Sequence, residues 1–386
     1  MTGGGSGGHI TPILAVAHEL KQLEAASELI YIGQTGDRLA DIPATDPAID
    51  QVYSVRAGKL RRYHGEGLRQ LLDLPTLFFN LRDAVYVLIG LVQSYRLLRR
   101  LRPDVIFIKG GFVGVPVGLA AAKLGIPFVT HDSDAIPGLA NRLIARWAAL
   151  HTVALPADVY RYPAAKTISV GIPLVGDFKP VTAALKAHYR QAIRLPTTAK
   201  MLFVIGGGLG AQRINQALFE IAPHLLAEYP DLQIVHGVGR ANEAAATAAY
   251  QAVLQPAALA RVHVKGYLTD LYRYSGTADV VVTRAGATNL AEFSVQGKAC
   301  IVVPSPFLTG GHQLKNAQVL ADAGAAVVVD EAAMQADPNF LARAISDLLK
   351  QPEAALAMGR QLQRLAHQDS ALRLTRILIK TAKTSA

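Results

Sequence analysis

The chain has 386 residues, of which 51% are hydrophobic and 18% are charged, and its formal net charge is +10. The length favours two globular domains, and the composition excludes a disordered or low-complexity protein. The positive charge favours an anionic partner, such as a nucleic acid, an anionic lipid or a phosphorylated substrate.

The chain begins with a glycine-rich loop, in which five glycines between positions 3 and 8 precede His9 and a helical pattern. Glycine lets backbone N–H groups approach a phosphate closely, and the N-terminus of the following helix adds a positive dipole. Such a loop normally follows a β-strand, but only Met1 and Thr2 precede it here. We expect either that a few upstream residues complete a first strand or that this strand is absent. No basic region followed by an apolar one is present at this end, so no secretory signal is predicted.

Residues 74–98 form the longest apolar stretch, although Arg82 and Asp83 lie near its middle. Its apolar side chains recur at spacings of three and four residues, which predicts an amphipathic helix rather than a membrane span. This apolar stripe consists of Leu74, Phe78, Leu81, Val85, Leu88, Val92 and Tyr95.

Short β-branched runs alternate with helical patterns along most of the chain, which predicts parallel βα units. The runs are 28–33, 104–109, 126–130, 151–155 and 167–170 in the first half, and 201–206, 232–237, 261–264, 279–283, 300–304 and 325–329 in the second. Residues 171–186 are interrupted by Pro and Gly and depart from this pattern, so the domain boundary is predicted there. The fold class is therefore α/β, with two Rossmann-like domains whose parallel sheets face a cleft.

A second glycine-rich turn, at 206–210, joins a predicted strand to a helical pattern, as a phosphate-binding turn does. Neither glycine loop ends in Gly-Lys-Ser/Thr, which excludes a P-loop. A dinucleotide site needs an acidic residue at the end of the next strand, but His236 and Gly237 occupy that position. Binding of NAD is therefore not expected, and no cofactor is predicted.

Two later turns carry polar side chains suited to a nucleotide sugar. After the strand at 279–283, Thr288 and Asn289 lie at the start of a helix, and Glu292 lies one turn further on. A carboxylate accepts two hydroxyl donors at once, which suits a ribose diol, although a solvated helix carboxylate is the alternative. After the strand at 300–304, His312 and Gln313 follow a third glycine-bearing turn, where they either bind sugar hydroxyls or cap a helix.

Six motifs together resemble the MurG family of N-acetylglucosaminyltransferases, in that family's order and over nearly the whole chain. They are GGGSGGHITPILAVAHEL (3–20), GGFVGVPVGLAAAKLGIPFVTHDSDAIPGLANRLIA (110–145), GIPLVGDF (171–178), VIGGGLGAQRIN (204–215), TRAGATNLAE (283–292) and GGHQLKNA (310–317). The resemblance implies the GT-B architecture. Residues 1–172 would be the acceptor- and membrane-facing domain, 173–368 the UDP-sugar domain, and 369–386 a helix returning to the first domain.

The resemblance also implies a reaction. The family transfers N-acetylglucosamine, with inversion, from UDP-N-acetylglucosamine to the undecaprenyl-diphosphate-linked muramoyl-pentapeptide. This step converts lipid I to lipid II in peptidoglycan synthesis, so the chain is expected to be a UDP-GlcNAc-dependent glycosyltransferase of cell wall biogenesis.

Site residues follow from the same resemblance. His9 is implied as the general base that takes the proton from the acceptor's C4 hydroxyl, with a structural, helix-capping histidine as the alternative. The implied binding residues are Ser6, Gly7 and Gly8 near the phosphates, Gly208 and Ala211 at the donor diphosphate, Leu268 at the uracil, Ala287, Thr288 and Asn289 along the donor, Glu292 at the ribose, and Gln313 at the sugar hydroxyls. A helix N-terminus and backbone amides would stabilise the departing UDP, so no metal ion is predicted.

The chain departs from the family's motifs at three places. Asp134, in HDSD, replaces the asparagine of the family's HEQN, which is expected to touch the donor sugar. Val175 replaces an arginine, and Gly208-Leu209 replaces Ser-Gln, so a cation and a hydroxyl are lost near the diphosphate. Arg213 or Arg284 is a candidate to compensate, although nothing in the sequence shows that either does. These departures leave the reaction class intact and bear on the choice of donor.

A lipid-linked acceptor requires the enzyme to meet the bilayer. Positions 56–102 contain ten Lys or Arg against three acidic residues. We therefore expect peripheral, salt-sensitive attachment to the anionic cytoplasmic face of the cell membrane, through residues 58–72 and the helix that follows. An ordinary helix face with solvated charges is the alternative.

Other function classes remain compatible with the sequence. They are a GT-B glycosyltransferase acting on another lipid, a UDP-sugar epimerase, and a non-catalytic nucleotide-binding protein. Nucleic-acid binding is not expected, because the single Trp and the scattered aromatic residues form no basic–aromatic array. The single cysteine, Cys300, excludes an internal disulfide and indicates a reducing compartment and a buried structural thiol.

Overall fold

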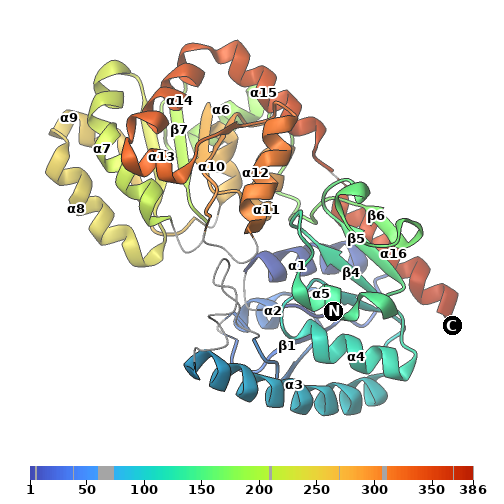
Figure 1. The fold of residues 1–386 in the computed structure, drawn as a ribbon. Coiled ribbons are helices and arrows are strands. Elements are labelled where there is room, and N and C mark those ends of the chain that lie inside the picture. Colours follow the sequence, from blue (N-terminus) through green and yellow to red (C-terminus); the bar gives the residue numbers. More distant parts are fainter. Residues whose placement is uncertain are drawn as a thin grey trace. The chain divides into compact units, whose positions relative to one another are not determined.

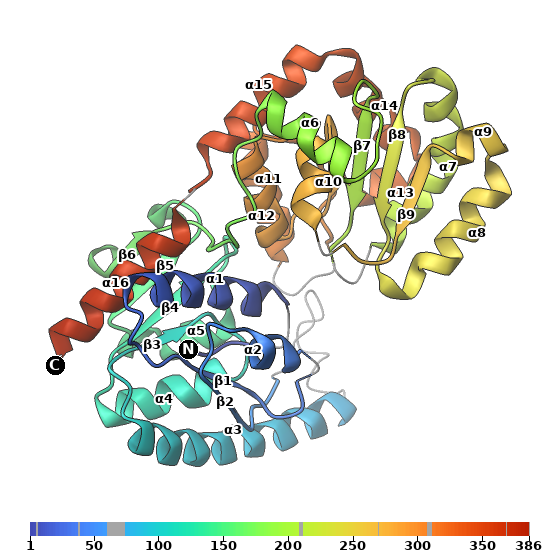
Figure 2. The same cartoon turned by 180° about the vertical axis from the view of Figure 1, so that it is seen from behind.

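The computed structural model describes residues 1–4, 7–37, 39–59, 74–207, 211–268, 270–306, 311–367 and 369–385. The chain forms two compact units (Figures 1 and 2). Unit 1 consists of Met1–Gly176 and His367–Ala386, and unit 2 consists of Asp177–Ala366. Unit 2 is thus inserted in the chain between the two segments that build unit 1.

Unit 1 is built on parallel strands. The strands are β1 (Ile30–Gln34), β2 (Gln51–Val55), β3 (Ile106–Ile108), β4 (Phe128–Asp132), β5 (Leu150–Val153) and β6 (Thr167–Ser169). β3 to β6 are hydrogen-bonded in that order, and β1 pairs with β2. Thr2 joins the two groups, because it forms parallel bridges to Ile32 of β1 and Ile108 of β3. Thr2 therefore holds the central strand position that precedes the first glycine loop.

Helices cover both faces of the unit 1 strands. They are α1 (Gly7–Leu23), α2 (Asp41–Thr45), α3 (Leu74–Leu101), α4 (Gly114–Leu124), α5 (Leu139–Ile144) and α16 (Ser370–Ser385), with 3-10 turns at Ala145–Trp147, Ala157–Val159 and Ala164–Lys166. α1 and α16 pack on one face, where Leu374 of α16 contacts the buried cluster around Phe107. α3, α4 and α5 cover the other face, around Ile108 and Phe128. The last helix of the chain is therefore part of the unit 1 core.

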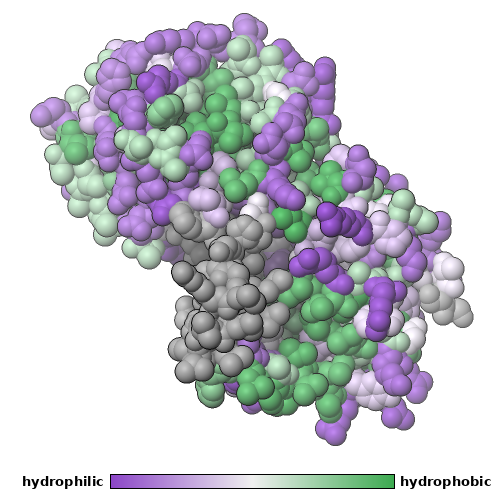
Figure 3. All heavy atoms as spheres, in the orientation of Figure 1, coloured by the Kyte–Doolittle hydropathy of each residue, from purple (hydrophilic) through white to green (hydrophobic). Residues whose placement is uncertain are grey.

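Most of the apolar stripe of α3 does not pack into the core, although Tyr95 packs against it. Phe78, Leu81 and Leu88 are 65%, 67% and 63% exposed, and Val85 and Val92 are also exposed. The buried side of the helix is formed instead by Asp83, Gly90, Ser94 and Leu98. A Cβ at Gly90 would lie 1.8 Å from the Arg56 carbonyl oxygen, so the segment after β2 packs backbone to backbone against α3. Figure 3 shows hydrophobic atoms gathered on the surface where Figure 1 places α3.

No helix within the described ranges is both long and apolar enough to cross a bilayer.

Unit 2 contains one six-stranded parallel sheet. Its strands are β7 (Met201–Ile205), β8 (Gln233–Gly237), β9 (Val262–Lys265), β10 (Val280–Thr283), β11 (Cys300–Val302) and β12 (Val327–Val328), in the spatial order β12-β11-β10-β7-β8-β9. Its helices are α6 (Ala183–Ala192), α7 (Gln212–Glu228), α8 (Glu243–Val253), α9 (Pro256–Leu259), α10 (Leu271–Thr277), α11 (Ala287–Gln296), α12 (His312–Asp322), α13 (Glu331–Ala336), α14 (Asn339–Lys350) and α15 (Pro352–Arg364), with a 3-10 turn at Arg240–Asn242.

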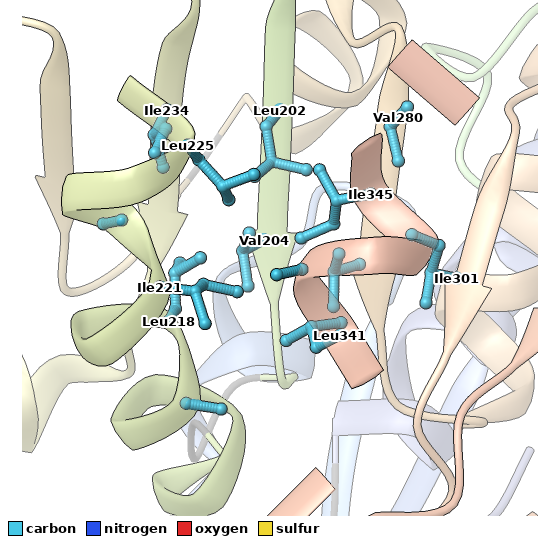
Figure 4. Close-up of a cluster of buried hydrophobic side chains, with 14 of the residues drawn as sticks. Leu202, Val204, Leu218, Ile221, Leu225, Ile234, Val280, Ile301, Leu341 and Ile345 are labelled. Atoms are coloured by element: carbon cyan, nitrogen blue, oxygen red, sulfur yellow. The ribbon is translucent and has the colours of Figure 1, made fainter. Parts of the chain in front are cut away.

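Alternating strand residues of unit 2 build a core on each face of the sheet. On one face, Leu202 and Val204 of β7 pack against Leu225 of α7 and Leu341 and Ile345 of α14 (Figure 4). On the other face, Phe203 belongs to a second buried cluster with residues of α11 and α12. The carboxyl ends of the strands, where α7 and α11 begin, form the edge that carries the predicted donor residues.

Each predicted strand run overlaps an observed strand, and the helix predicted over 74–98 is α3. The expected α/β fold with two parallel sheets is confirmed. The sequence pattern does not predict β2, because this edge strand is largely exposed and carries polar Gln51 and Ser54. Cys300 is fully buried in β11, as expected for a structural thiol.

Candidate functional site

His9 lies in the first turns of α1, where Gly7 and Gly8 also lie; Ser6 falls outside the described residues. Its Nδ1 donates a hydrogen bond to the Gly4 carbonyl oxygen at 2.8 Å. A carbonyl can only accept, so Nδ1 carries the proton of the neutral ring and the lone pair lies on Nε2. This is the tautomer that a general base acting through Nε2 requires.

The charges around His9 determine its protonation. Burial, followed by the nearby Lys109 ammonium, lowers the pKa of His9 to about 4. The hydrogen bond to Gly4 and the charges of Asp134 and Asp37 act in the opposite direction. The imidazole is therefore neutral at pH 7.

The glycine turn that follows β3 packs directly on the N-terminal glycine loop. Gly110 and Gly111 follow β3 with φ of 116° and 83°, a conformation that favours glycine. A Cβ at Gly111 would lie 2.7 Å from the Gly4 carbonyl oxygen, and one at Gly110 would lie 3.7 Å from His9 Nε2. Only residues without side chains allow the two backbones to approach each other beside the imidazole.

Asn141 of α5 adds a polar group next to this turn. Its amide nitrogen donates to the His131 carbonyl and to Asp132 Oδ1, each at 3.0 Å. Its Oδ1 is buried and has no hydrogen-bond partner among the described residues. The carboxamide oxygen is therefore a buried acceptor near the Gly110 turn.

Unit 2 contains a pocket of about 140 Å³ at the carboxyl ends of β7, β8 and β9. Glycines 207, 237, 239 and 266 lie along it, so backbone rather than side chains forms much of its wall. Leu268 and Asn289 are the predicted donor residues that line it within the described part of the chain. Tyr267, which also lines the pocket, lies under the Arg240 guanidinium at 4.2 Å.

Glu292 follows Asn289 by three residues on α11, so the two side chains lie on the same side of the helix. Its Oε2 is buried and has no hydrogen-bond partner among the described residues. Burial raises the pKa of Glu292 to about 8, so the carboxyl group is mostly protonated at pH 7. A buried carboxyl that lacks donors in this way is suited to a ligand that brings hydroxyl donors.

The other predicted donor residues lie at helix starts around the same edge of the sheet. Ala287 and Thr288 are half-buried at the start of α11, and Ala211 is buried next to the first residue of α7. Gln313, in the first turn of α12, accepts a hydrogen bond from the Ser305 N–H at 2.9 Å through Oε1. Gly208 falls outside the described residues.

The two arginines expected to replace the missing cation are engaged by one carboxylate. Arg213 Nη1 lies 2.5 Å from Glu331 Oε2, and Arg284 also pairs with Glu331, which is 2% exposed. Arg284 donates a further hydrogen bond to the Val303 carbonyl at 3.1 Å. These contacts link α7, the loop after β10 and α13. Because both guanidinium groups already pair with Glu331, the structure does not support the expectation that either arginine compensates for Val175.

Sequence reasoning did not single out Lys109, Asn141 or Tyr267. Lys109 ends an apolar strand run, and its burial is visible only once β3 and β4 are paired. The glycines at 237, 239 and 266 could have been found, because each lies in the turn after a predicted strand. Within the described ranges, no group of three His, Cys, Asp or Glu side chains is arranged to hold a metal ion.

Comparison with known sequences identifies relatives over the full length. Residues 1–152 match the glycosyltransferase family 28 N-terminal domain, and residues 201–374 match the glycosyltransferase family 28 C-terminal domain. A relative from Natranaerobius thermophilus is 31% identical over 379 residues, which are 98% of each chain. A relative from Bacillus cereus is 29% identical over 384 residues, which are 99% of each chain. Both are named as a UDP-N-acetylglucosamine--N-acetylmuramyl-(pentapeptide) pyrophosphoryl-undecaprenol N-acetylglucosamine transferase.

Solved structures share the fold. MurG from Acinetobacter baumannii superposes with a TM-score of 0.74 at 24% identity, over 98% of each chain. The glycosyltransferase of kitacinnamycin gives 0.69 at 18% identity, over 99% of this chain and 98% of that chain. A UDP-GlcNAc 2-epimerase from Neisseria meningitidis gives 0.65 at 14% identity, over 98% of each chain. These likenesses confirm the GT-B fold, and because an epimerase shares it, the fold alone does not identify the reaction.

Proposed function

The chain belongs to glycosyltransferase family 28, and from that premise we propose that it transfers N-acetylglucosamine from UDP-N-acetylglucosamine to an undecaprenyl-diphosphate-linked muramoyl-pentapeptide. The transfer inverts the anomeric carbon and converts lipid I to lipid II in peptidoglycan synthesis. The observation that carries this proposal is the 31% identity, over 98% of each chain, to a relative named for this transfer.

His9 is the general base of the proposed reaction. Its Nε2 takes the proton of the acceptor's C4 hydroxyl, whose oxygen then bonds to the anomeric carbon of the donor. The bond from that carbon to the diphosphate oxygen breaks, and UDP leaves with the electron pair. The hydrogen bond from Nδ1 to Gly4 supports this role, because it fixes the lone pair on Nε2. A diphosphate near Ser6, Gly7 and Gly8 would raise the pKa of His9 from about 4 toward neutrality.

The nucleoside of the donor occupies the unit 2 pocket in this proposal. The backbone of Leu268 faces the uracil, and the buried carboxyl of Glu292 accepts the ribose hydroxyls. Glu292 Oε2 has no hydrogen-bond partner among the described residues, which supports this assignment, because a diol supplies hydroxyl donors.

The rest of the donor extends along helix starts. Gly208, Ala211 and the N-terminus of α7 take the diphosphate, with Ala287, Thr288 and Asn289 beside them. Asp134 and Gln313 bind the sugar hydroxyls, and the bond from Ser305 to Gln313 Oε1 leaves the amide nitrogen for that role.

The proposed acceptor is a lipid, and α3 is the element that meets the bilayer. A helix that buries Asp83 and Ser94 while exposing Phe78, Leu81 and Leu88 presents its apolar side outward along its length. Lipid covers such a stripe without any other protein partner, and Lys or Arg around it attract anionic headgroups. The basic segment 58–72 belongs to the same contact, although residues 60–73 lie outside the described part. We place the enzyme as a peripheral protein on the cytoplasmic face of the membrane.

A transfer assay tests the proposed function. Radiolabelled UDP-N-acetylglucosamine is incubated with a short-chain analogue of the lipid-linked acceptor, and the label is expected in the lipid product only when acceptor is present. Epimerised UDP-sugar in the absence of lipid would instead identify an epimerase. Transfer only to diacylglycerol or a polyprenyl phosphate would identify a different lipid glycosyltransferase.

A further inference from the structure

The turns after β8 and β9 meet along the unit 2 pocket. Gly239 of the first turn and Gly266 of the second both line this pocket. The Val238 N–H donates a hydrogen bond to the Lys265 carbonyl at 2.9 Å, so the two turns are joined one residue before each glycine. The residues that directly follow the two glycines are therefore held close to each other at the edge of the pocket.

The first of these turns is fixed by hydrogen bonds of its own. Gly239 has a φ of 91°, a conformation that favours glycine, and it leads into the 3-10 turn Arg240–Asn242. The Asn242 N–H donates to the Gly239 carbonyl at 2.9 Å, and the Asn242 side-chain amide donates to the Val238 carbonyl at 2.9 Å. The backbone at Arg240 is therefore set relative to the pocket before any ligand binds.

The side chains of Arg240 and Tyr267 stack on each other. The guanidinium carbon lies 4.2 Å from the centroid of the Tyr267 ring. A guanidinium is attracted to the negative face of an aromatic ring, so this contact favours one orientation of a side chain that is 55% exposed. Tyr267 also lines the pocket, so its ring is a preset wall against which a planar group can pack.

The charge of Arg240 is not neutralised by a neighbouring side chain. No carboxylate among the described residues forms an ion pair with it, although Glu243 follows by three positions. The arginines of α7 and of the loop after β10 differ in this respect, because both pair with Glu331. The ring of Tyr267 is therefore the partner that the structure shows for the Arg240 guanidinium.

We propose that Arg240 is a positioning residue for the donor: it holds the Tyr267 ring as one wall of the pocket, and the pyrimidine base of a nucleoside diphosphate packs against that ring. The inference rests on the proposed placement of the donor nucleoside in this pocket. A ring that is already oriented loses less conformational freedom when the base binds, which strengthens binding. The diphosphate is placed at the start of α7, after β7, so Arg240 on the turn after β8 acts through the ring.

Binding of UDP and UMP to the full-length protein, measured by calorimetry, tests the inference. Arg240→Ala is expected to weaken both ligands by the same factor, about two- to fivefold, because the ring loses its cation. Tyr267→Ala is expected to weaken both by about fivefold or more, whereas Tyr267→Phe, which keeps the ring, should bind like the wild type. Adding Arg240→Ala to Tyr267→Ala should weaken binding no further.

Arg343→Ala is the matched control. Its guanidinium lies over the Phe340 ring at 4.6 Å in the same unit, and neither residue lines the pocket. This variant should bind UDP normally. In transfer assays, Arg240→Ala is expected to raise the KM for the donor and to leave kcat and the melting temperature unchanged, which separates positioning of the donor from a structural role.

Two results would overturn the inference while leaving the pocket as the nucleoside site. A greater loss for UDP than for UMP that persists in the Tyr267→Ala background would show that Arg240 meets the phosphates directly. Normal binding in Arg240→Ala, together with weak binding in Tyr267→Ala, would show that the ring needs no cation. If neither variant changes UDP affinity, the nucleoside binds elsewhere and the inference falls with that placement. Normal UDP binding without transfer to the lipid-linked acceptor would overturn the proposed function alone.

Discussion

At pH 7 the His9 imidazole is neutral, because burial and the Lys109 ammonium lower its pKa to about 4. A base with so low a pKa accepts protons weakly, and general bases work best when their pKa lies near the operating pH. The diphosphates of donor and acceptor bring negative charge that raises the pKa of a neighbouring histidine. The proposed site therefore keeps the ring unprotonated before substrates bind and makes it a stronger base once they have bound.

Replacing His9 by Ala is expected to lower kcat by about 10²–10⁴-fold and to leave donor affinity unchanged, because general bases contribute in this range. Steady-state transfer assays and calorimetry with UDP-N-acetylglucosamine measure the two quantities. His18→Ala is the matched control, since His18 is an exposed histidine on the same helix. Near-normal kcat together with a lower melting temperature would show that His9 only caps the helix.

We expect Glu292 to make donor binding depend on pH. Burial raises the pKa of its carboxyl to about 8 in the free protein, and hydroxyl donors from the ribose favour the charged form. The donor must therefore displace a proton, so its affinity is expected to rise between pH 6 and 8 and to level off above about pH 8.

Calorimetry in buffers of different ionisation enthalpy measures the protons released when UDP-N-acetylglucosamine binds. Glu292→Gln is expected to bind more weakly and to release none. Equal proton release from the wild type and Glu292→Gln would place the titrating group elsewhere.

The sequence points to His9 and Glu292 as candidates, because each follows a glycine-rich or small-residue turn before a helix, and their roles stay predictions. It could not predict Lys109 or Asn141, since their roles depend on partners brought close by strand pairing. Ser133, which accepts from Lys109, lies 24 residues along the chain. The same limit applies to Arg213 and Arg284, whose shared partner Glu331 is remote in sequence.

At the scale of elements, α3 departs from an ordinary amphipathic helix. Five of its periodic apolar residues, from Phe78 to Val92, are exposed. The buried side is narrow and partly polar, because the backbone at 56–58 packs closely against it. A Cβ at Gly58 would lie 2.0 Å from the Asp83 carbonyl oxygen, so larger side chains on this side would not fit. Periodicity predicts that the helix exists, but not which side it buries.

Leu81→Asn with Leu88→Asn is expected to weaken binding to anionic liposomes by about tenfold or more, because two leucines no longer enter the interface. Thermal stability is expected to change little, since both side chains are exposed. Flotation at low and high salt measures the binding. Leu356→Asn on α15 is the control, because Leu356 is also an exposed leucine and lies in unit 2.

The electrostatic part of membrane binding is tested separately by changing Lys59, Arg61 and Arg62 together to Ser. This variant should bind anionic liposomes less tightly while its UDP affinity stays unchanged. If liposome binding does not change with the α3 substitutions, with lipid charge or with salt, neither α3 nor the basic segment is the membrane contact.

The sequence pattern predicts strands whose two faces are buried better than strands at the edge of a sheet. β7 and β10 are nearly continuous apolar runs in the middle of a sheet, and their sequence alone locates them. Among the described strands, β2 pairs with β1 alone, and it carries polar residues and lacks that pattern. Thr2 occupies a central strand position that is too short to show any periodicity, and only the bridges to Ile32 and Ile108 reveal it.

At the scale of the whole molecule, the two ends of the chain share one core. Leu374 and Leu378 of α16 are buried with Ile13 and Val16 of α1, and Thr375 Oγ1 donates to the Val16 carbonyl at 3.4 Å. Unit 1 is therefore complete only when the last helix, which follows unit 2 in the chain, has packed against α1. The resemblance implied this return, whereas composition and periodicity alone would have left α16 as a helix of unknown position.

Because each unit has its own buried core, we expect that the stability of each unit can be measured separately. Leu374 and Leu341 are both fully buried leucines, the first in unit 1 and the second in unit 2. Truncating either to Ala leaves a cavity, which is expected to lower the free energy of unfolding of its own unit by about 2–5 kcal/mol. The single tryptophan, Trp147, lies in unit 1 and reports the unfolding of that unit alone.

In urea titrations, Leu374→Ala is expected to lower the unfolding midpoint that Trp147 fluorescence reports. Leu341→Ala should leave that midpoint unchanged and should lower the midpoint of the unit 2 transition in far-UV circular dichroism. UDP-N-acetylglucosamine should raise the transition of unit 2 by mass action, because the proposed nucleoside pocket lies within that unit. A common shift of both probes in both variants would mean that the two units unfold as one cooperative body. In that case the substitution in α16 would also weaken the donor pocket, and donor affinity in Leu374→Ala would fall at urea concentrations where the wild type still binds.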